Sequence, residues 1–268
     1  MFIGQTELLN TINNYTLKSL PHQLLLFGHR GCGKHTIAKY IANKFNLEYL
    51  TIDSKLSNEE IINLQLTPVN TLCVIEVANF SEKQQNQFLK LIEEPNKNIF
   101  IIILAEHENG ILPTILNRCM KYYFKDYTKE ELQAIANIDN DLVYKICNTP
   151  GQVLVAKDNI ELVEDLYNLC TKLVLNITNA TYSNTLTIAS KINYKDEYNK
   201  FDFDMFFNML AYTSFEIYIK DNNLNALKIY QYTIKYLQDL LNKRLIKETF
   251  VIRFITEIWE DLVLCQQL

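Results

Sequence analysis

The chain has 268 residues, of which 48% are hydrophobic, and a formal net charge of −5 at pH 7. This length accommodates two domains, and the apolar share supplies enough side chains for a substantial buried core. The acidic balance argues against a chain that binds nucleic acid strongly through its own charge, and it leaves any basic surface to a partner.

The cysteines and the N-terminal sequence indicate the cellular compartment. The six cysteines are scattered, form no Cys-x-x-Cys pair and do not cluster with the four histidines, so the sequence predicts no zinc or other metal site of this kind. Free thiols are typical of a reducing compartment. The sequence shows no basic-then-apolar leader and no run of about 18 apolar residues. We therefore expect a soluble, cytoplasmic protein without a membrane segment.

Apolar runs alternate with helical patterns over residues 1–125. Short apolar runs predict strands at 24–27, 48–53, 72–78, 99–105 and 120–124. Apolar residues at helical spacing predict helices at about 5–18, 34–46, 57–65, 81–94 and 110–117. Ser81 is a candidate N-cap, and Pro95 is expected to end the helix that Ser81 begins. The alternation predicts an α/β fold, a five-stranded parallel sheet with helices on both faces.

After residue 125 the strand patterns stop. Residues 127–156 predict two or three short helices, interrupted by Asn148-Thr149-Pro150-Gly151. From about residue 159, long amphipathic helices predict an all-α bundle, with an Asn-rich loop at 181–199. Two expected core stripes are Leu227, Tyr230, Ile234, Leu237 and Leu241, and Val251, Ile255, Ile258 and Leu262. We predict three domains, at 1–125, 126–158 and 159–268.

The most informative motif is Gly-His-Arg-Gly-Cys-Gly-Lys-His-Thr at residues 28–36. It follows the apolar run Leu24–Phe27 and precedes a helical pattern. Strand, glycine-rich loop and helix in this order point backbone N–H groups and a helix N-terminus at a phosphate. The motif departs from the phosphate-binding pattern at one position, because His35 replaces the hydroxyl residue that holds Mg²⁺.

The loop and one strand-end acid supply the candidate cofactor-binding residues. Lys34 is expected to reach the β- and γ-phosphates. His35 is a poor ligand because Mg²⁺ prefers hard oxygens, and Thr36 stands one residue late. We therefore expect ATP or ADP to bind weakly or not at all, and Mg²⁺ only together with nucleotide. The full candidate set is Gly28, Gly31, Gly33, Lys34, His35, Thr36 and Glu76.

Glu76 ends the apolar run that begins at Leu72, where a phosphate-loop protein places a carboxylate for Mg²⁺. It is either that carboxylate or a solvated acid at a strand end, and both interpretations stay open. Val77 follows where hydrolytic proteins of this class carry a second acid. Valine can neither polarise water nor accept a proton, which argues against efficient hydrolysis. Cys32 lies in the loop without a clear base, so we assign it no catalytic role.

Four short segments resemble motifs of clamp-loader subunits in the AAA+ superfamily and occur in that family's order. Phe2-Ile3-Gly4-Gln5 is similar to its Ile-Gly-Gln opening, and residues 88–95 are similar to its Leu-Leu-Lys-x-Leu-Glu-Glu-Pro helix. Residues 112–119 resemble its Ser-Arg-Cys segment, and residues 148–151 resemble its Gly-Ser-Pro-Gly turn. The resemblance covers residues 2 to about 155. Among subfamilies, it is most similar to the delta-prime subunit of bacterial DNA polymerase III clamp loaders or a phage counterpart.

This resemblance implies an architecture, partners and one active residue. The implied parts are an AAA+ phosphate-loop core, a helical lid and a helical collar, matching the three predicted domains. The implied partners are other clamp-loader subunits, a sliding clamp and, through the complex, primer–template DNA. Arg118 is implied to be an arginine finger that reaches ATP held by a neighbouring subunit in trans. Its alternative interpretation is an ordinary surface arginine near a sheet edge.

Several departures from the family pattern fall in the nucleotide site. Active members carry Gly-Lys-Thr and Asp-Glu-Ala where this chain has Gly-Lys-His and Glu76-Val77-Ala78. Ala105-Glu106 lacks the threonine or asparagine that senses the γ-phosphate, and Gln152 stands where active subunits often carry arginine. These departures imply a noncatalytic subunit. Two alternatives are an active AAA+ ATPase of a clamp loader or helicase loader, and a stand-alone phosphate-loop kinase or transferase.

Overall fold

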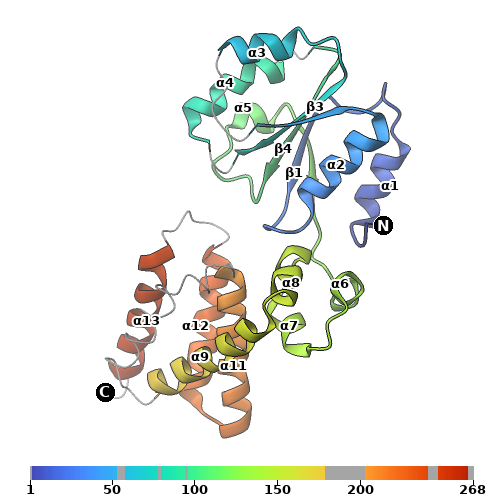
Figure 1. Ribbon diagram of the computed structural model, residues 1–268. Helices are drawn as coiled ribbons and strands as arrows, with labels where there is room; N and C mark the ends of the chain where they lie inside the picture. The colour runs from blue at the N-terminus through green and yellow to red at the C-terminus, as the bar shows by residue number, and fades with distance from the viewer. Residues whose placement is uncertain are drawn as a thin grey trace. The chain divides into compact units, whose positions relative to one another are not determined.

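The computed structural model describes residues 2–52, 58–77, 80–93, 96–178, 203–240 and 247–264. The chain divides into two compact units, Met1–Tyr127 and Thr128–Leu268, each of which is described by itself (Figure 1). The expected loop at 181–199 and the expected helix end at Pro95 lie outside the described residues. Within the described residues, no helix is both long and apolar enough to cross a membrane.

The first unit is built on a parallel sheet of five strands in the order β2-β3-β4-β1-β5. Every neighbouring pair is parallel. The strands are β1 Gln23–Phe27, β2 Glu48–Ile52, β3 Thr71–Glu76, β4 Ile99–Ala105 and β5 Met120–Tyr123. These bounds confirm the fold class and the five predicted strands, each to within two residues at either end.

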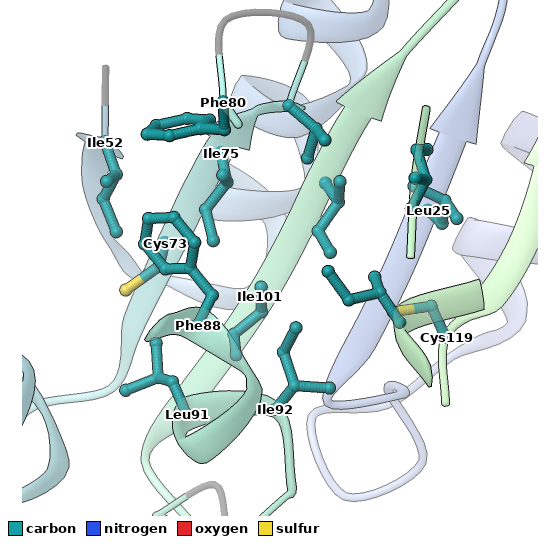
Figure 2. Close-up of a cluster of buried hydrophobic side chains, with 14 of the residues drawn as sticks. Leu25, Ile52, Cys73, Ile75, Phe80, Phe88, Leu91, Ile92, Ile101 and Cys119 are labelled. Carbon is teal, nitrogen blue, oxygen red and sulfur yellow. The ribbon is translucent and has the colours of Figure 1, made fainter. Parts of the chain in front are cut away.

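Helices cover both faces of this sheet, as Figure 1 shows. They are α1 Thr6–Asn14, α2 Lys34–Phe45, α3 Asn58–Gln65, α4 Glu82–Glu93 and α5 Pro113–Leu116. Successive strand side chains point to opposite faces. Leu25 therefore joins the core cluster beneath α4 and α5 (Figure 2), and so does Phe27, whereas Leu24 and Leu26 join the cluster beneath α1 and α2. Burial on both faces explains the continuous apolar runs of the central strands.

The carboxyl ends of β1, β4 and β3 meet at one edge of the sheet. Phe27 pairs with Ala105, and Glu76 pairs with Leu104, so β4 separates β1 from β3. At the usual spacing between strands, the ends of β1 and β3 lie roughly 10 Å apart. Ligands of open parallel sheets bind outside this edge, which makes it the place to examine for function.

Among its described residues, the second unit contains helices and no strand. Its helices are α6 Lys129–Ala136, α7 Asp141–Ile146, α8 Pro150–Lys157, α9 Ile160–Thr178, α11 Phe203–Asp221, α12 Leu224–Leu240 and α13 Lys247–Leu264. The three short helices α6 to α8 confirm the prediction for this stretch. Helices α6 and α8 both begin with a complete capping box, formed by Thr128 with Glu131 and by Thr149 with Gln152.

The buried face of α12 differs from the predicted stripe by one residue. The stripe residues Leu227, Tyr230, Ile234 and Leu237 are half-buried, and Leu241 lies outside the described residues. The fully buried positions are instead Ala226, Ile229, Thr233 and Tyr236. Thr233 tolerates burial because its hydroxyl donates to the Ile229 carbonyl at 2.7 Å. In α13, the predicted core residues Ile255, Ile258 and Leu262 are buried as expected, and the side chain of Val251 lies outside the described part of the structure.

Candidate functional site

The loop between β1 and α2 has the backbone geometry of an anion site. Gly31 and Gly33 adopt positive φ angles of 79° and 100°, which glycine tolerates best. Gly33 is the N-cap of α2, and no side chain of the described residues caps this helix. The first turn of α2 also contains no acidic residue. The N–H groups at this helix start are therefore available to a phosphate.

The loop is also held closely by its surroundings. A methyl group on Gly28 would lie 2.7 Å from Cys32 Sγ, so only glycine fits there. The Tyr127 hydroxyl donates to the Cys32 carbonyl at 2.8 Å. The Phe2 ring lies 3.2 Å from where a methyl group on Gly33 would stand. The sequence patterns did not indicate these supporting roles for Phe2 and Tyr127, because both depend on contacts between distant parts of the chain.

Lys34 is bound to its own loop. Its side chain is buried, and Nζ donates to the Gly28 carbonyl at 2.5 Å and to the His29 carbonyl at 3.0 Å. An ammonium group has three N–H donors, so one remains for a ligand. The loop and Lys34 together fit a phosphate group.

His35 and Thr36, the residues of the loop nearest the expected Mg²⁺ position, are poorly suited to bind this ion. His35 is exposed, and its Nδ1 lies 3.4 Å from the hydroxyl oxygen of Tyr49 on β2. Thr36 is exposed on the first turn of α2, one position after the place where the hydroxyl is needed. An imidazole is a soft substitute for the hard oxygen ligand that Mg²⁺ prefers. Among the described residues, no group of three or more His, Cys, Asp or Glu side chains could hold a metal ion.

The strand ends beside the loop carry acids, but not at the position where hydrolysis needs one. Glu76 is exposed at the end of β3. The Val77 side chain is buried in the core cluster beneath α4, so it faces neither water nor a phosphate. Burial raises the pKa of the Cys32 thiol, an effect that Lys34 opposes and Glu106 reinforces. Cys32 is therefore a neutral thiol at neutral pH.

In the second unit, Gln152 has a structural role. Its side chain is buried, and Oε1 accepts hydrogen bonds from the backbone N–H groups of Asn148 at 2.7 Å and Thr149 at 3.2 Å. These bonds complete the capping box of α8. Gln152, which stands where the family resemblance implied an arginine, therefore caps the N-terminus of α8.

Arg118 lies in the first unit, two residues after the end of α5, and its side chain is 41% exposed. The neighbouring residues Ile115 and Cys119 are buried, which turns Arg118 outward from the core. Its Nη1 donates to the Thr114 carbonyl at 3.0 Å, and its Nη2 lies 3.0 Å from Glu93 Oε1 at the end of α4. The Arg118 side chain therefore contacts α5 and the end of α4, and no hydrogen bond or ion pair among the described residues joins it to the loop.

A buried glutamine fixes the start of the segment that carries Arg118. Gln85 on α4 is 1% exposed, its Nε2 donates to the Gly110 carbonyl at 2.7 Å, and its Oε1 accepts from the Leu112 N–H at 2.9 Å. Leu112 is the N-cap of α5. Figure 2 shows Phe88, Leu91 and Ile92 of α4 in the same core cluster as Cys119. Helix α4 thus anchors both ends of the Arg118 segment.

Comparison with known proteins gives partial matches to replication proteins. A family profile described as "DNA polymerase III, delta subunit" matches residues 66–128, which include α4, α5 and Arg118. The DNA polymerase III subunit gamma of Buchnera aphidicola subsp. Schizaphis graminum is 28% identical over 165 residues, covering 48% of this chain and 46% of the relative. The subunit tau of Bacillus subtilis is 25% identical over 196 residues, covering 60% and 33%. The Replication factor C subunit 3 of Saccharomyces cerevisiae is 23% identical over 154 residues, covering 50% and 45%.

The chain thus spans less than half the length of each of these three relatives. Among solved structures, a gamma subunit-related protein of Thermotoga maritima superposes with a TM-score of 0.51 at 15% identity, covering 96% of this chain and 99% of that one. A RuvB variant of the same organism gives a TM-score of 0.50 at 17% identity, covering 81% and 78%. These structures show the fold alone. The chain has a P-loop AAA+ fold, and its sequence resembles AAA+ clamp-loader subunits.

Proposed function

We propose that this chain is a noncatalytic, delta-prime-like subunit of a DNA polymerase clamp loader. In this role it completes a ring of subunits and donates Arg118 to ATP that a neighbouring subunit holds. Its partners would be the other clamp-loader subunits, the sliding clamp and, through the complex, primer–template DNA in the cytoplasm. The observation that carries the proposal is a contrast between two positions, since Val77 is buried in the core whereas Arg118 is exposed and turned outward.

The chain's own site supports binding better than turnover. The glycine loop, the start of α2 and Lys34 would hold the phosphates of ATP or ADP, and the nucleotide would supply the anion that these donors fit. The residue that follows Glu76 is Val77, which is buried in the core and cannot position water. His35 cannot supply the hydroxyl for Mg²⁺. Weak binding without hydrolysis follows from this combination.

Arg118 has the properties that a donated arginine needs. An arginine finger stabilises negative charge on the transferring phosphoryl group and accelerates hydrolysis about 10³-fold or more. It must reach a neighbour, so it has to be exposed and carried on a defined segment. Arg118 meets both requirements, because the core residues Ile115 and Cys119 flank it and Gln85 fixes the start of α5.

Titration of the purified full-length chain with ATP and ADP, with and without Mg²⁺, tests the first half of the proposal. We expect weak binding that Mg²⁺ barely changes, and no phosphate release. Lys34→Ala should weaken the binding further, while His35→Thr should introduce a Mg²⁺ dependence because it restores the hydroxyl ligand. Mg²⁺-dependent turnover by the wild-type chain, abolished by Lys34→Ala, would refute the noncatalytic assignment.

That result would favour a second candidate, an active AAA+ ATPase subunit. Three observations support this candidate. The relatives of greatest similarity described above are gamma and tau subunits, and the loop already has the conformation of a phosphate site. Lys34 also retains one free N–H donor. The measured turnover number of the isolated chain separates the two candidates directly.

A further inference from the structure

The ion pair between Arg118 and Glu93 joins two segments that also share a hydrophobic core. Glu93 is the last residue of α4, and Arg118 follows α5. Leu91 and Ile92, just before Glu93, are buried in the same cluster as Ile115 and Cys119, on either side of Arg118. The packing of these apolar side chains brings the two charges together, so the pair does not depend on the chance meeting of two long side chains.

The pair leaves most of the guanidinium group available. The side chains of Arg118 and Glu93 are 41% and 44% exposed. A guanidinium group carries five N–H donors in a fixed plane. One donor on Nη1 is used by the Thr114 carbonyl and one on Nη2 by the Glu93 carboxylate, so three remain for another anion. Glu93 and Thr114 together hold the group by both terminal nitrogens without saturating it.

Because Glu93 is the last residue of α4, its carboxylate is more stable when paired with Arg118 than when unpaired. A carboxylate at the C-terminal end of a helix meets the negative end of the helix dipole. A cation beside Glu93 offsets this repulsion, and Arg118 supplies it. The nearby Arg118 cation therefore stabilises the Glu93 carboxylate even though the pair is exposed to water. Neither the fold nor the core requires a carboxylate at this position.

We propose that Glu93 is a positioning residue that orients the guanidinium of Arg118 toward the ATP of the neighbouring subunit. This inference rests on the proposed function of Arg118 as a donated arginine. A long arginine side chain samples many rotamers, and fixing it before the neighbour arrives raises the fraction of complexes in reactive geometry. Glu93 binds one terminal nitrogen of the group and Thr114 binds the other, which leaves three N–H donors for the phosphates of the neighbour's ATP.

The first test needs no partner. In the full-length chain, ¹⁵N relaxation of the Arg118 Nε–Hε group reports how far the side chain is immobilised on the fast timescale. Glu93→Ala should lower its order parameter clearly, whereas Glu93→Gln, which keeps an acceptor oxygen, should lower it less. Glu82→Ala is the matched control, because Glu82 is an exposed acid of the same helix for which the described residues show no ion pair. An unchanged order parameter in Glu93→Ala would overturn the inference.

The second test measures ATP hydrolysis by the complex purified through an affinity tag on this chain. Exposed ion pairs of this kind correspond to changes of about two- to fivefold. Glu93→Ala should lower kcat by about that factor without changing KM for ATP, and Glu93→Gln should restore at least part of the loss. In an Arg118→Ala background, Glu93→Ala should have no further effect, because the group that it orients is gone.

The outcomes distinguish a failure of the positioning role of Glu93 from a failure of the proposed function of Arg118. If Arg118→Ala lowers kcat but Glu93→Ala does not, the positioning role is wrong and the donated arginine stands. If Glu93→Ala raises kcat, the carboxylate restrains the arginine and the inference is overturned. If Arg118→Ala leaves kcat unchanged, the proposed function itself fails and the positioning role fails with it.

Discussion

Two glycines of the phosphate loop are required for different physical reasons. Gly28 has no room for a side chain, because Cys32 Sγ and Phe124 Cβ would lie 2.7 and 2.8 Å from an added methyl group. Gly33 instead needs a backbone conformation, with φ at 100°, that other residues adopt only under strain. One glycine is fixed by space and the other by the backbone.

Gly33→Ala should therefore destabilise the chain by about 1–2 kcal/mol in urea unfolding. The strained φ and the nearby Phe2 ring both contribute to this loss. Gly151→Ala is the control, since Gly151 lies within α8 and does not have a positive φ. An alanine within a helix is neutral or stabilising by about 0.5–1 kcal/mol. Equal effects of the two substitutions would contradict this account of the loop.

Residue identity alone was enough to predict some parts of the site. The glycines and Lys34 could be recognised because their spacing in the sequence is itself the motif. Phe2, Tyr127 and Gln85 could not, because their contacts form only after segments distant in sequence come together. A buried glutamine also has no sequence signature, since the hydrogen bonds of Gln85 to Gly110 and Leu112 depend on the path of another loop.

At the scale of elements, helix α4 follows β3 along the chain and contacts the segment that bears Arg118. Its Gln85 side chain satisfies the Gly110 carbonyl and the Leu112 N–H at the start of α5. Its last residue, Glu93, pairs with Arg118 beyond the end of α5. A helix of only four residues is not stable by itself, so α5 depends on these attachments and on the shared core.

Gln85→Leu should loosen α5 while leaving the sheet intact. It removes the acceptor of the Leu112 N–H and the donor to the Gly110 carbonyl, both partly buried, and also the donor to the Phe80 carbonyl. We expect native-state hydrogen exchange at the Leu112 amide to become about tenfold faster or more. Gln87→Leu, on the same helix and half-buried, should leave this amide unchanged. Unaltered exchange in Gln85→Leu would show that the glutamine does not hold α5.

The capping box of α8 gives a second prediction at this scale. Arginine has no acceptor atom, so Gln152→Arg removes the partner of the Asn148 and Thr149 N–H groups and places a charge at a buried position. It should destabilise the chain by about 2 kcal/mol or more in chemical unfolding. Gln133→Arg, at an exposed position of α6, should change stability by about 0.5 kcal/mol at most. A harmless Gln152→Arg would show that the cap is dispensable.

Elements were easier to predict from the sequence than their packing. The five strands follow from short apolar runs, because both faces of a central parallel strand are buried. The strand order β2-β3-β4-β1-β5 does not follow from those runs, since alternation leaves it open. The face of α12 was predicted one residue away from the buried one because Ala226 and Thr233 contribute little to an apolar stripe. Small residues mark close helix packing without adding much hydrophobicity.

At the scale of the whole molecule, the two units contribute different features to the proposed function. The first unit contains the phosphate loop and Arg118, and the second provides helical surface beyond its own core. Several large apolar side chains of the second unit remain exposed, including Phe215, Ile219 and Leu224. Under the proposed function these side chains are available for subunit contacts. The net charge of −5 is consistent with a subunit that leaves most DNA phosphate contacts to its partners.

The most direct test of the central claim is the ATPase rate of the assembled complex with two variants of this chain. Arg118→Ala should lower the rate by about 10³-fold at the site that it serves, with assembly intact. Lys34→Ala should leave the rate nearly unchanged, because this chain does not hydrolyse ATP in the proposed complex. The opposite pattern, a rate that falls with Lys34→Ala and persists with Arg118→Ala, would contradict the account.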